Sequence, residues 1–166
     1  MTHAKRIAIN GYGRIGRAIL RAIVERDLQH RLQVVAINDL GIAESVVYET
    51  RYDSVHGPFP AVIEVTQNGM QVVSKTATTS IDLLQVGHAP KLPWHDLNVD
   101  LVMECSGKMS ERSLAQQHLN AGAKKVLIGA AAGTDVDLTV VYGINHHLIQ
   151  PSHKIVSNAS CTTNYM

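Results

Sequence analysis

The chain has 166 residues, of which 45% are hydrophobic and 17% charged, and 15 basic against 14 acidic residues leave a net charge of +1. This length suits one domain with a packed core. No long run of one charge is present, which argues against a nucleic-acid or anionic membrane partner. No apolar stretch approaches the roughly 20 residues that span a bilayer, and the N-terminus has no signal-peptide core, so we expect a soluble, cytoplasmic protein.

The first part of the chain has the pattern of a strand, a helix and a second strand. Residues 6–10 form a short β-branched run, and residues 32–38 form a continuous apolar run, typical of a parallel strand covered on both faces. Between them, apolar residues recur at helical spacing from Ile15 to Ile23. A further helix is expected at residues 44–51.

The middle of the chain predicts an antiparallel insertion. Two apolar runs, residues 61–66 and 70–74, flank the pair Asn68-Gly69. This pair favours a two-residue hairpin turn.

The second half returns to buried strands, which are predicted at residues 99–107, 124–129, 138–143 and 154–158. A helix is expected after the first of them, with Ser110 as N-cap and Gly122 as C-cap. The last residues, "SNASCTTNYM", predict a strand that enters a helix capped by Ser160. The predicted fold class is therefore α/β, a doubly wound and mostly parallel Rossmann-type sheet with a small antiparallel hairpin insertion.

The spacing Gly11-x-Gly13-x-x-Gly16 follows the first strand and opens the first helix. In a dinucleotide-binding loop, the first glycine permits the tight turn, the second lets a pyrophosphate approach the backbone, and the third lets the helix pack on the sheet. The helix N-terminus adds unpaired N–H groups and partial positive charge, and Arg14 adds a formal charge. An ordinary glycine turn is the alternative explanation.

Asp39 follows the second strand, 23 residues after Gly16. An acidic side chain there can accept hydrogen bonds from an adenosine ribose, and its charge disfavours a 2′-phosphate, so NAD is predicted rather than NADP. Ser106, Gly107 and Gly129 end two further strands, where open α/β sheets bind ligands. Loop or capping roles explain each of these residues nearly as well when it is taken alone.

Two cysteines occur, Cys105 and Cys161, and their spacing suggests neither a disulfide framework nor a metal site. Cys161 is predicted at the mouth of a helix, where a thiol can become nucleophilic. A buried apolar role is the alternative for a lone cysteine, and Cys105, inside an apolar run, fits it. None of the nine histidines is identified as a general base.

Several segments resemble the phosphorylating glyceraldehyde-3-phosphate dehydrogenases and the related erythrose-4-phosphate dehydrogenases: "INGYGRIGR", "AIND", "YDSVHG", "LPW", "ECSG", "AGAKKV" and "VSNASCTTN". The resemblance implies an NAD-dependent oxidation of a phosphorylated aldehyde, with inorganic phosphate as the second substrate. It implies that Cys161 is the catalytic nucleophile and that Ser160 and Thr162 adjoin the substrate phosphate. The predicted cofactor-binding residues are Asn10, Gly11, Gly13, Arg14, Ile15, Gly16, Asp39, Ser106, Gly107 and Gly129.

The resemblance also implies a division of the chain into an NAD-binding domain, residues 1–157, and the start of a catalytic domain, residues 158–166. The general-base histidine of the family belongs to the part of that domain that this chain lacks, so we expect the chain alone to be inactive. A homo-oligomer is expected for a full-length protein. Triose and tetrose phosphates stay open as substrates, and a non-catalytic nucleotide-binding module is the alternative from another class.

The chain departs from the family pattern at several positions. Gly129-Ala130-Ala131 replaces the usual Ser-Ala-Pro, which removes a hydroxyl near the nicotinamide. His88, Met109 and Pro58 also differ from the residues common in the family.

Overall fold

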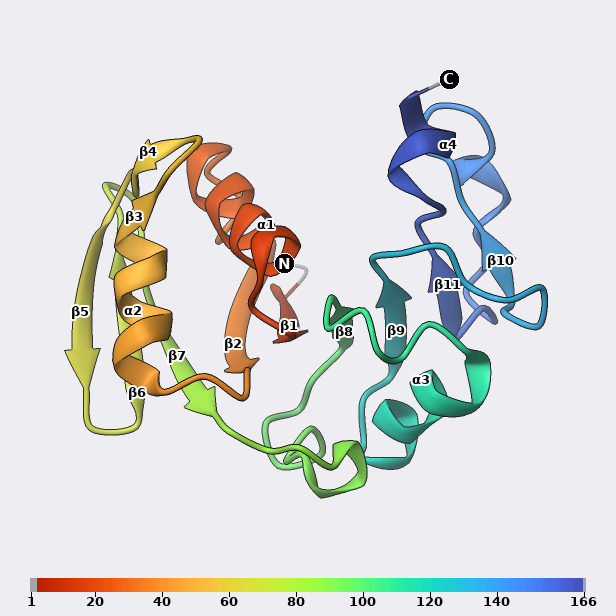
Figure 1. Ribbon diagram of the computed structural model, residues 1–166, viewed down its shortest axis with the longest axis horizontal. Helices are drawn as coiled ribbons and strands as arrows, with labels where there is room; N and C mark the ends of the chain where they lie inside the picture. The colour runs from red at the N-terminus through yellow and green to blue at the C-terminus, as the bar shows by residue number, and fades with distance from the viewer. Residues whose placement is uncertain (1–2, 166) are drawn as a thin grey trace.

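The computed structural model describes residues 3–165, so residues 1–2 and 166, the outer ends of the two predicted domains, lie outside it. The predicted strand–helix–strand unit is confirmed as β1 (Lys5–Asn10), α1 (Arg14–Glu25) and β2 (Leu32–Asn38). Figure 1 shows α1 and α2 (Ala43–Arg51) in the left half of the view and α3 (Arg112–Asn120) at the lower right.

The predicted fold class is confirmed. A nine-stranded sheet has the order β10-β11-β9-β8-β1-β2-β7-β6-β5. Pairing is parallel from β10 to β7, and the edge strands β6 and β5 are antiparallel. The other strands are β5 (Val62–Thr66), β6 (Gly69–Val73), β7 (Thr78–Leu84), β8 (Leu101–Glu104), β9 (Lys125–Ile128), β10 (Leu138–Thr139) and β11 (Ile155–Ser157). A separate short ribbon pairs β3 (Tyr52–Asp53) with β4 (Gly57–Pro58).

Each face of the sheet buries its own apolar cluster. Ile7 and Ile9 of β1 pack with α1 and α2 residues on one face. Ala8, between them, joins Ala115 of α3 and Trp94 on the other face. Alternate residues of a strand point to opposite faces, so a central strand covered on both sides reads as a continuous apolar run.

The hairpin is confirmed, but its turn lies one residue earlier than predicted. Thr66 pairs with Gly69, so Gln67 and Asn68 form the loop. Gly69 belongs to β6, and a Cβ atom there would lie 2.1 Å from the carbonyl oxygen of Ile81. The glycine therefore serves close strand packing, and the hairpin extends the main sheet through β7, a strand that the sequence analysis did not predict.

Two other expectations need correction. Helix α3 has Glu111 as N-cap rather than Ser110, without a side-chain cap, and its C-cap is Ala121; Gly122 follows with φ 107°. The strand predicted at residues 138–143 is only Leu138–Thr139, because the chain turns away after Val140. The remaining elements are two short 3-10 helices, η1 (Ala89–Lys91) and η2 (His146–Leu148), and the terminal helix α4 (Cys161–Tyr165).

Among residues 3–165, no helix has the length and apolar character needed to cross a membrane.

Candidate functional site

The predicted site residues gather at one edge of the sheet. Asn10, at the end of β1, pairs with Glu104 of β8, which pairs with Ile128 of β9, which pairs with Ser157 of β11. Because these strands are parallel, the glycine loop, Ser106, Gly129 and Cys161 all follow carboxyl ends at the same edge. This is the edge at which open α/β sheets bind ligands.

Gly11 and Gly16 are required by the fold itself. Gly11 has φ 86°, and a Cβ atom on it would lie 2.4 Å from the backbone nitrogen of Ser106. A Cβ atom on Gly16 would lie 2.4 Å from the carbonyl oxygen of Gly11. The first glycine thus lets the loop turn against the β8 loop, and the third lets α1 pack against the strand.

Gly13 has no such intramolecular reason to be glycine. Its φ of −74° is ordinary for any residue, and a Cβ atom there would meet nothing within 4 Å. It caps α1, whose first turn has no side-chain cap and no acidic residue. Within the described part of the chain, the N–H groups of Arg14, Ile15 and Gly16 have no hydrogen-bond acceptor. The open position beside free N–H groups fits a bound anion such as a pyrophosphate.

Asp39 braces the glycine loop. Its Oδ2 accepts a hydrogen bond from the N–H of Tyr12 at 2.7 Å, and its Oδ1 accepts one from the N–H of Gly41 at 2.8 Å. Each carboxylate oxygen can accept a second hydrogen bond, so this bracing leaves acceptor capacity for a ribose hydroxyl. The loop-bracing role that the sequence left open is therefore real.

A cleft of about 400 Å³ lies between the loops that follow β1, β2 and β8. Its walls combine backbone and polar groups with the apolar side chains of Leu40, Val86 and Met109. It brings together five of the predicted residues: Asn10, Gly11, Gly13, Asp39 and Ser106. Cys105, for which the sequence analysis favoured a buried apolar role, also lines it. A larger hollow of about 520 Å³ between α2 and the β5–β6 hairpin contains none of them.

The other predicted residues lie outside the walls of this cleft. Arg14 and Ile15 are exposed on the first turn of α1, and Gly107 is exposed with φ 71°. Gly129 is linked to the loop by packing, because a Cβ atom there would lie 3.6 Å from Cγ2 of Ile15 and 3.4 Å from Sγ of Cys105. These two distances are ordinary contacts, and only the carbonyl oxygen of Glu104, 3.3 Å from that Cβ position, would be tight against a larger residue.

The two thiols have different surroundings. Burial raises the pKa of Cys105 to about 12, and the nearby Glu104 carboxylate acts in the same direction. Cys161 is exposed at the start of α4. The expected cap is present, since Ser160 Oγ accepts a hydrogen bond from the N–H of Thr163 at 3.1 Å and lies 2.9 Å from Oγ1 of Thr162. Hydroxyl groups thus cluster on the residues that flank Cys161 in the chain.

A buried polar network behind the cleft was not found from the sequence. Glu104 is 2% exposed, and its Oε2 accepts hydrogen bonds from Asn10 Nδ2 at 2.6 Å and His118 Nε2 at 2.8 Å. Its Oε1 accepts bonds from the backbone N–H and the hydroxyl of Ser106. Burial acts to raise the pKa of Glu104, but the hydrogen bonds from His118, Ser106 and Asn10 outweigh it and lower the pKa. The only sequence signals are a Glu that ends an apolar strand and a His at an apolar helix position.

Comparisons with known proteins agree with this geometry. Residues 5–112 match the family model described as "Glyceraldehyde 3-phosphate dehydrogenase, NAD binding domain". The chain is 50% identical over 159 residues to the glyceraldehyde-3-phosphate dehydrogenase of Pseudomonas aeruginosa. It is 47% identical to the plasmid-encoded and 46% identical to the chromosomal glyceraldehyde-3-phosphate dehydrogenase of Cupriavidus necator, again over 159 residues.

Each of these alignments covers 96% of this chain but 46% of the relative, so the chain spans about half the length of the curated relatives it matches. The family match itself includes β1, α1, β2 and β8, and hence the glycine loop, Asp39 and Ser106. The chain therefore belongs to the glyceraldehyde 3-phosphate dehydrogenase family and carries the NAD-binding domain of that family.

Proposed function

We propose that the cleft between the β1, β2 and β8 loops holds NAD and serves the oxidation of a phosphorylated aldehyde, glyceraldehyde 3-phosphate, to an acyl phosphate. The observation that carries the proposal is Gly13, which no contact among residues 3–165 requires to be glycine and which adjoins the N–H groups of α1 that have no acceptor in that part of the chain. A side chain there would project into the space that a diphosphate needs. The family match to an NAD-binding domain supports the same ligand.

The residues proposed to hold the cofactor divide by the part they would contact. Gly11, Gly13 and the N–H groups of Arg14 and Ile15 would bind the pyrophosphate, and the Arg14 guanidinium would add a positive charge. Asp39 would accept a ribose hydroxyl while it keeps the loop in place. Asn10, Gly16, Ser106, Gly107 and Gly129 would shape or support the walls. NAD, when bound, would accept the hydride that the aldehyde carbon releases.

Cys161 is proposed as the nucleophile of the reaction. Its sulfur would form a bond to the aldehyde carbon, and inorganic phosphate would later displace it from the oxidised acyl group. Three features support this role: the side chain is exposed, it follows β11 at the edge that carries the cleft, and it begins a helix. The hydroxyls of Ser160 and Thr162, beside it, are proposed to adjoin the substrate phosphate.

The division of the chain at residue 158 is part of the same proposal. Residues 158–166 would begin a catalytic domain whose other groups complete the site in a longer protein, which we expect to form a homo-oligomer. Correct placement of reacting groups can supply about 7–11 kcal/mol of a reaction barrier. We therefore expect the 166-residue chain to bind NAD without appreciable dehydrogenase activity.

A calorimetric titration tests the cofactor site. NAD is titrated into the chain and into the Asp39→Ala variant, which we expect to bind about tenfold or more weakly, because a hydrogen bond to a charged group contributes about 1.5–3 kcal/mol. Asp39→Asn is the matched control, since it keeps one acceptor for the loop but lacks the charge. It should discriminate less against NADP than the wild type does.

Equal NAD affinity in the wild type and Asp39→Ala would remove the ribose assignment. Thermal unfolding of all three proteins separates lost ligand contacts from loosening of the glycine loop.

A further inference from the structure

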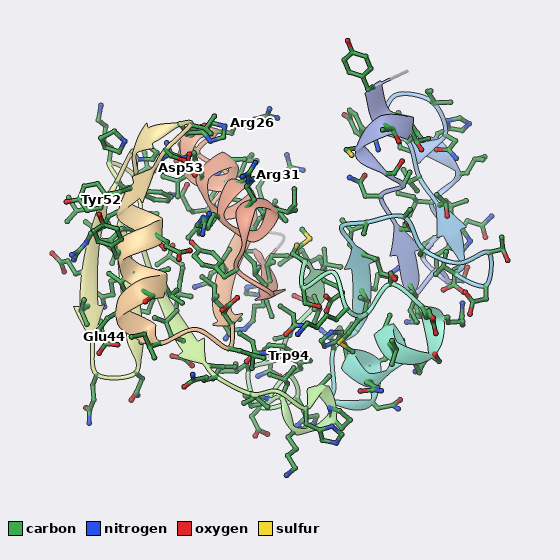
Figure 2. All side chains as sticks on the ribbon, in the orientation of Figure 1. Arg26, Arg31, Glu44, Tyr52, Asp53 and Trp94 are labelled. Carbon is green, nitrogen blue, oxygen red and sulfur yellow. The ribbon has the colours of Figure 1, made fainter. Side chains whose placement is uncertain are left out.

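A chain of hydrogen bonds connects the walls of the cleft to Trp94, a side chain in the apolar core. Trp94 is fully buried in the cluster that packs under α3, and Figure 2 marks it at the lower centre, near the segment between β7 and β8. Its Nε1 donates a hydrogen bond to Nδ1 of His118 at 3.0 Å. His118 is also fully buried, and its other ring nitrogen contacts Glu104.

These contacts fix the proton on the imidazole. An indole nitrogen is a donor only, so Nδ1 of His118 must accept and carries no proton. The single proton of the neutral ring is then on Nε2, which donates to Glu104 Oε2. If the proton moved to Nδ1, two N–H groups would face each other across 3.0 Å in a buried place.

The carboxylate of Glu104 has no spare acceptor site. Four donors meet its two oxygens: His118, Asn10, and the N–H and hydroxyl of Ser106. Asn10 passes the constraint on, since its Oδ1 accepts a hydrogen bond from Asn38 Nδ2 at 2.7 Å. Asn38 in turn holds the backbone of Val86.

Beyond Glu104, the network ends at the walls of the cleft. Asn10, Asn38, Val86 and Ser106 all line it, and they come from the loops after four different strands or from the strand ends themselves. Trp94 and His118 do not line it. Through hydrogen bonds, a change at either buried ring reaches the cleft by way of Glu104.

We propose that Trp94 and His118 are positioning residues of the cofactor cleft: the indole sets the tautomer of His118, and His118 holds Glu104 where its carboxylate fixes Asn10 and Ser106. This inference rests on the proposed NAD site. A well-satisfied buried network of this kind rigidifies the groups at its ends, and a rigid wall loses less entropy when a ligand binds.

The test combines binding and spectroscopy on the 166-residue chain. His118→Phe keeps a planar ring but removes both nitrogens, and we expect NAD affinity measured by calorimetry to fall at least about fivefold, the lower end of typical coupling between sites. His118→Gln can donate to Glu104 and accept from Trp94, and it should restore affinity to within about twofold of the wild type. Val126→Ala, at another fully buried position on β9, is the control for lost stability alone.

Three results would overturn the proposal. One is wild-type affinity in a folded His118→Phe variant, and another is an equal loss of affinity in Val126→Ala. The third uses nitrogen-15 NMR of the wild type, which should show His118 protonated on Nε2; a proton on Nδ1 contradicts the network whether or not any variant folds.

The design separates the two proposals. If the wild-type chain binds no NAD, the proposed cofactor site fails. The positioning role is then decided by amide hydrogen exchange of Ser106, which should be several-fold faster in His118→Phe and unchanged in Val126→Ala.

Discussion

The three glycines of the first loop should respond to alanine in two different ways. In Gly11→Ala, the left-handed backbone of φ 86° costs about 1–2 kcal/mol for a residue with a Cβ atom. The new methyl group would also lie 2.4 Å from Ser106 N and 2.7 Å from the carbonyl carbon of Cys105. These are backbone atoms that cannot rotate away, and overpacking of this kind costs about 1–3 kcal/mol. The expected loss of stability is about 2–5 kcal/mol, the sum of these two ranges.

Gly13→Ala should leave stability almost unchanged. Alanine is a poorer N-cap than glycine by about 0.5–1 kcal/mol, while the lower entropy of its unfolded chain returns about 0.4–1 kcal/mol. Its methyl group meets no protein atom within 4 Å. If a diphosphate occupies that space, NAD affinity should fall about tenfold or more, since even 1.4 kcal/mol of crowding has that effect.

Urea unfolding, followed by the fluorescence of Trp94, the single tryptophan and a buried one, measures the stability of the variants. Calorimetry measures their affinity for NAD. A Gly13→Ala protein that binds NAD like the wild type would refute the assignment of this open position to the ligand. A Gly13→Ala protein as unstable as Gly11→Ala would refute the division into structural and ligand-binding glycines.

Three further outcomes are expected. Iodoacetamide at pH 8 should label Cys161 and spare Cys105, because burial raises the pKa of the Cys105 thiol to about 12. Peptide mass spectrometry measures the labelling, and label found mainly on Cys105 would contradict this expectation. Arg21→Lys should destabilise the fold by about 1–3 kcal/mol, because the buried guanidinium donates hydrogen bonds to the carbonyls of both Gly57 and Pro58, and an ammonium group cannot reproduce this planar pair of donors. An unchanged midpoint of urea unfolding would contradict this expectation. The pKa of Asp137 is lowered to about 2 by hydrogen bonds from Ile155, Arg112 and Lys154, which outweigh the opposing effect of burial. Its contribution to stability is thus complete above the ordinary pKa of 3.8 and is lost as pH falls towards 2. Stability should therefore fall less steeply over this range in Asp137→Asn than in the wild type, and an equally steep fall would count against the assignment.

Most of the central fold could be predicted because strands buried on both faces of the sheet have recognisable apolar sequences. The strand predicted at residues 32–38 has those bounds, and the crossover from β1 to β2 followed from a run of apolar residues at helical spacing. Strand β7 was missed since its sequence, "TTSIDLL", mixes polar and apolar residues at the place where the parallel sheet meets the hairpin. Its partners, β2 and β6, decide its conformation.

The site was predictable where chemistry is local in sequence and hidden where it is not. Gly11, Gly13 and Gly16 form a motif that can be read in one place, and each has a distinct environment in the structure. The Glu104 network joins Asn10, Trp94 and His118, which only the sheet brings together. Gly69 is a smaller example: the sequence suggested that it forms the turn, whereas the structure uses it for the close approach of β6 to Ile81.

Because the glycine loop packs directly against the backbone of Ser106, the loops that follow β1 and β8 constrain each other's length. One inserted residue after β1 would displace either Gly11 from the backbone of Ser106 or the start of α1 from the cleft. The β5–β6 turn lies at the sheet edge, and lengthening such a loop costs little, with each doubling adding only about 0.6 kcal/mol. Insertions and deletions among homologous chains should therefore accumulate at residues 67–68 and be absent from the loops that follow β1 and β8.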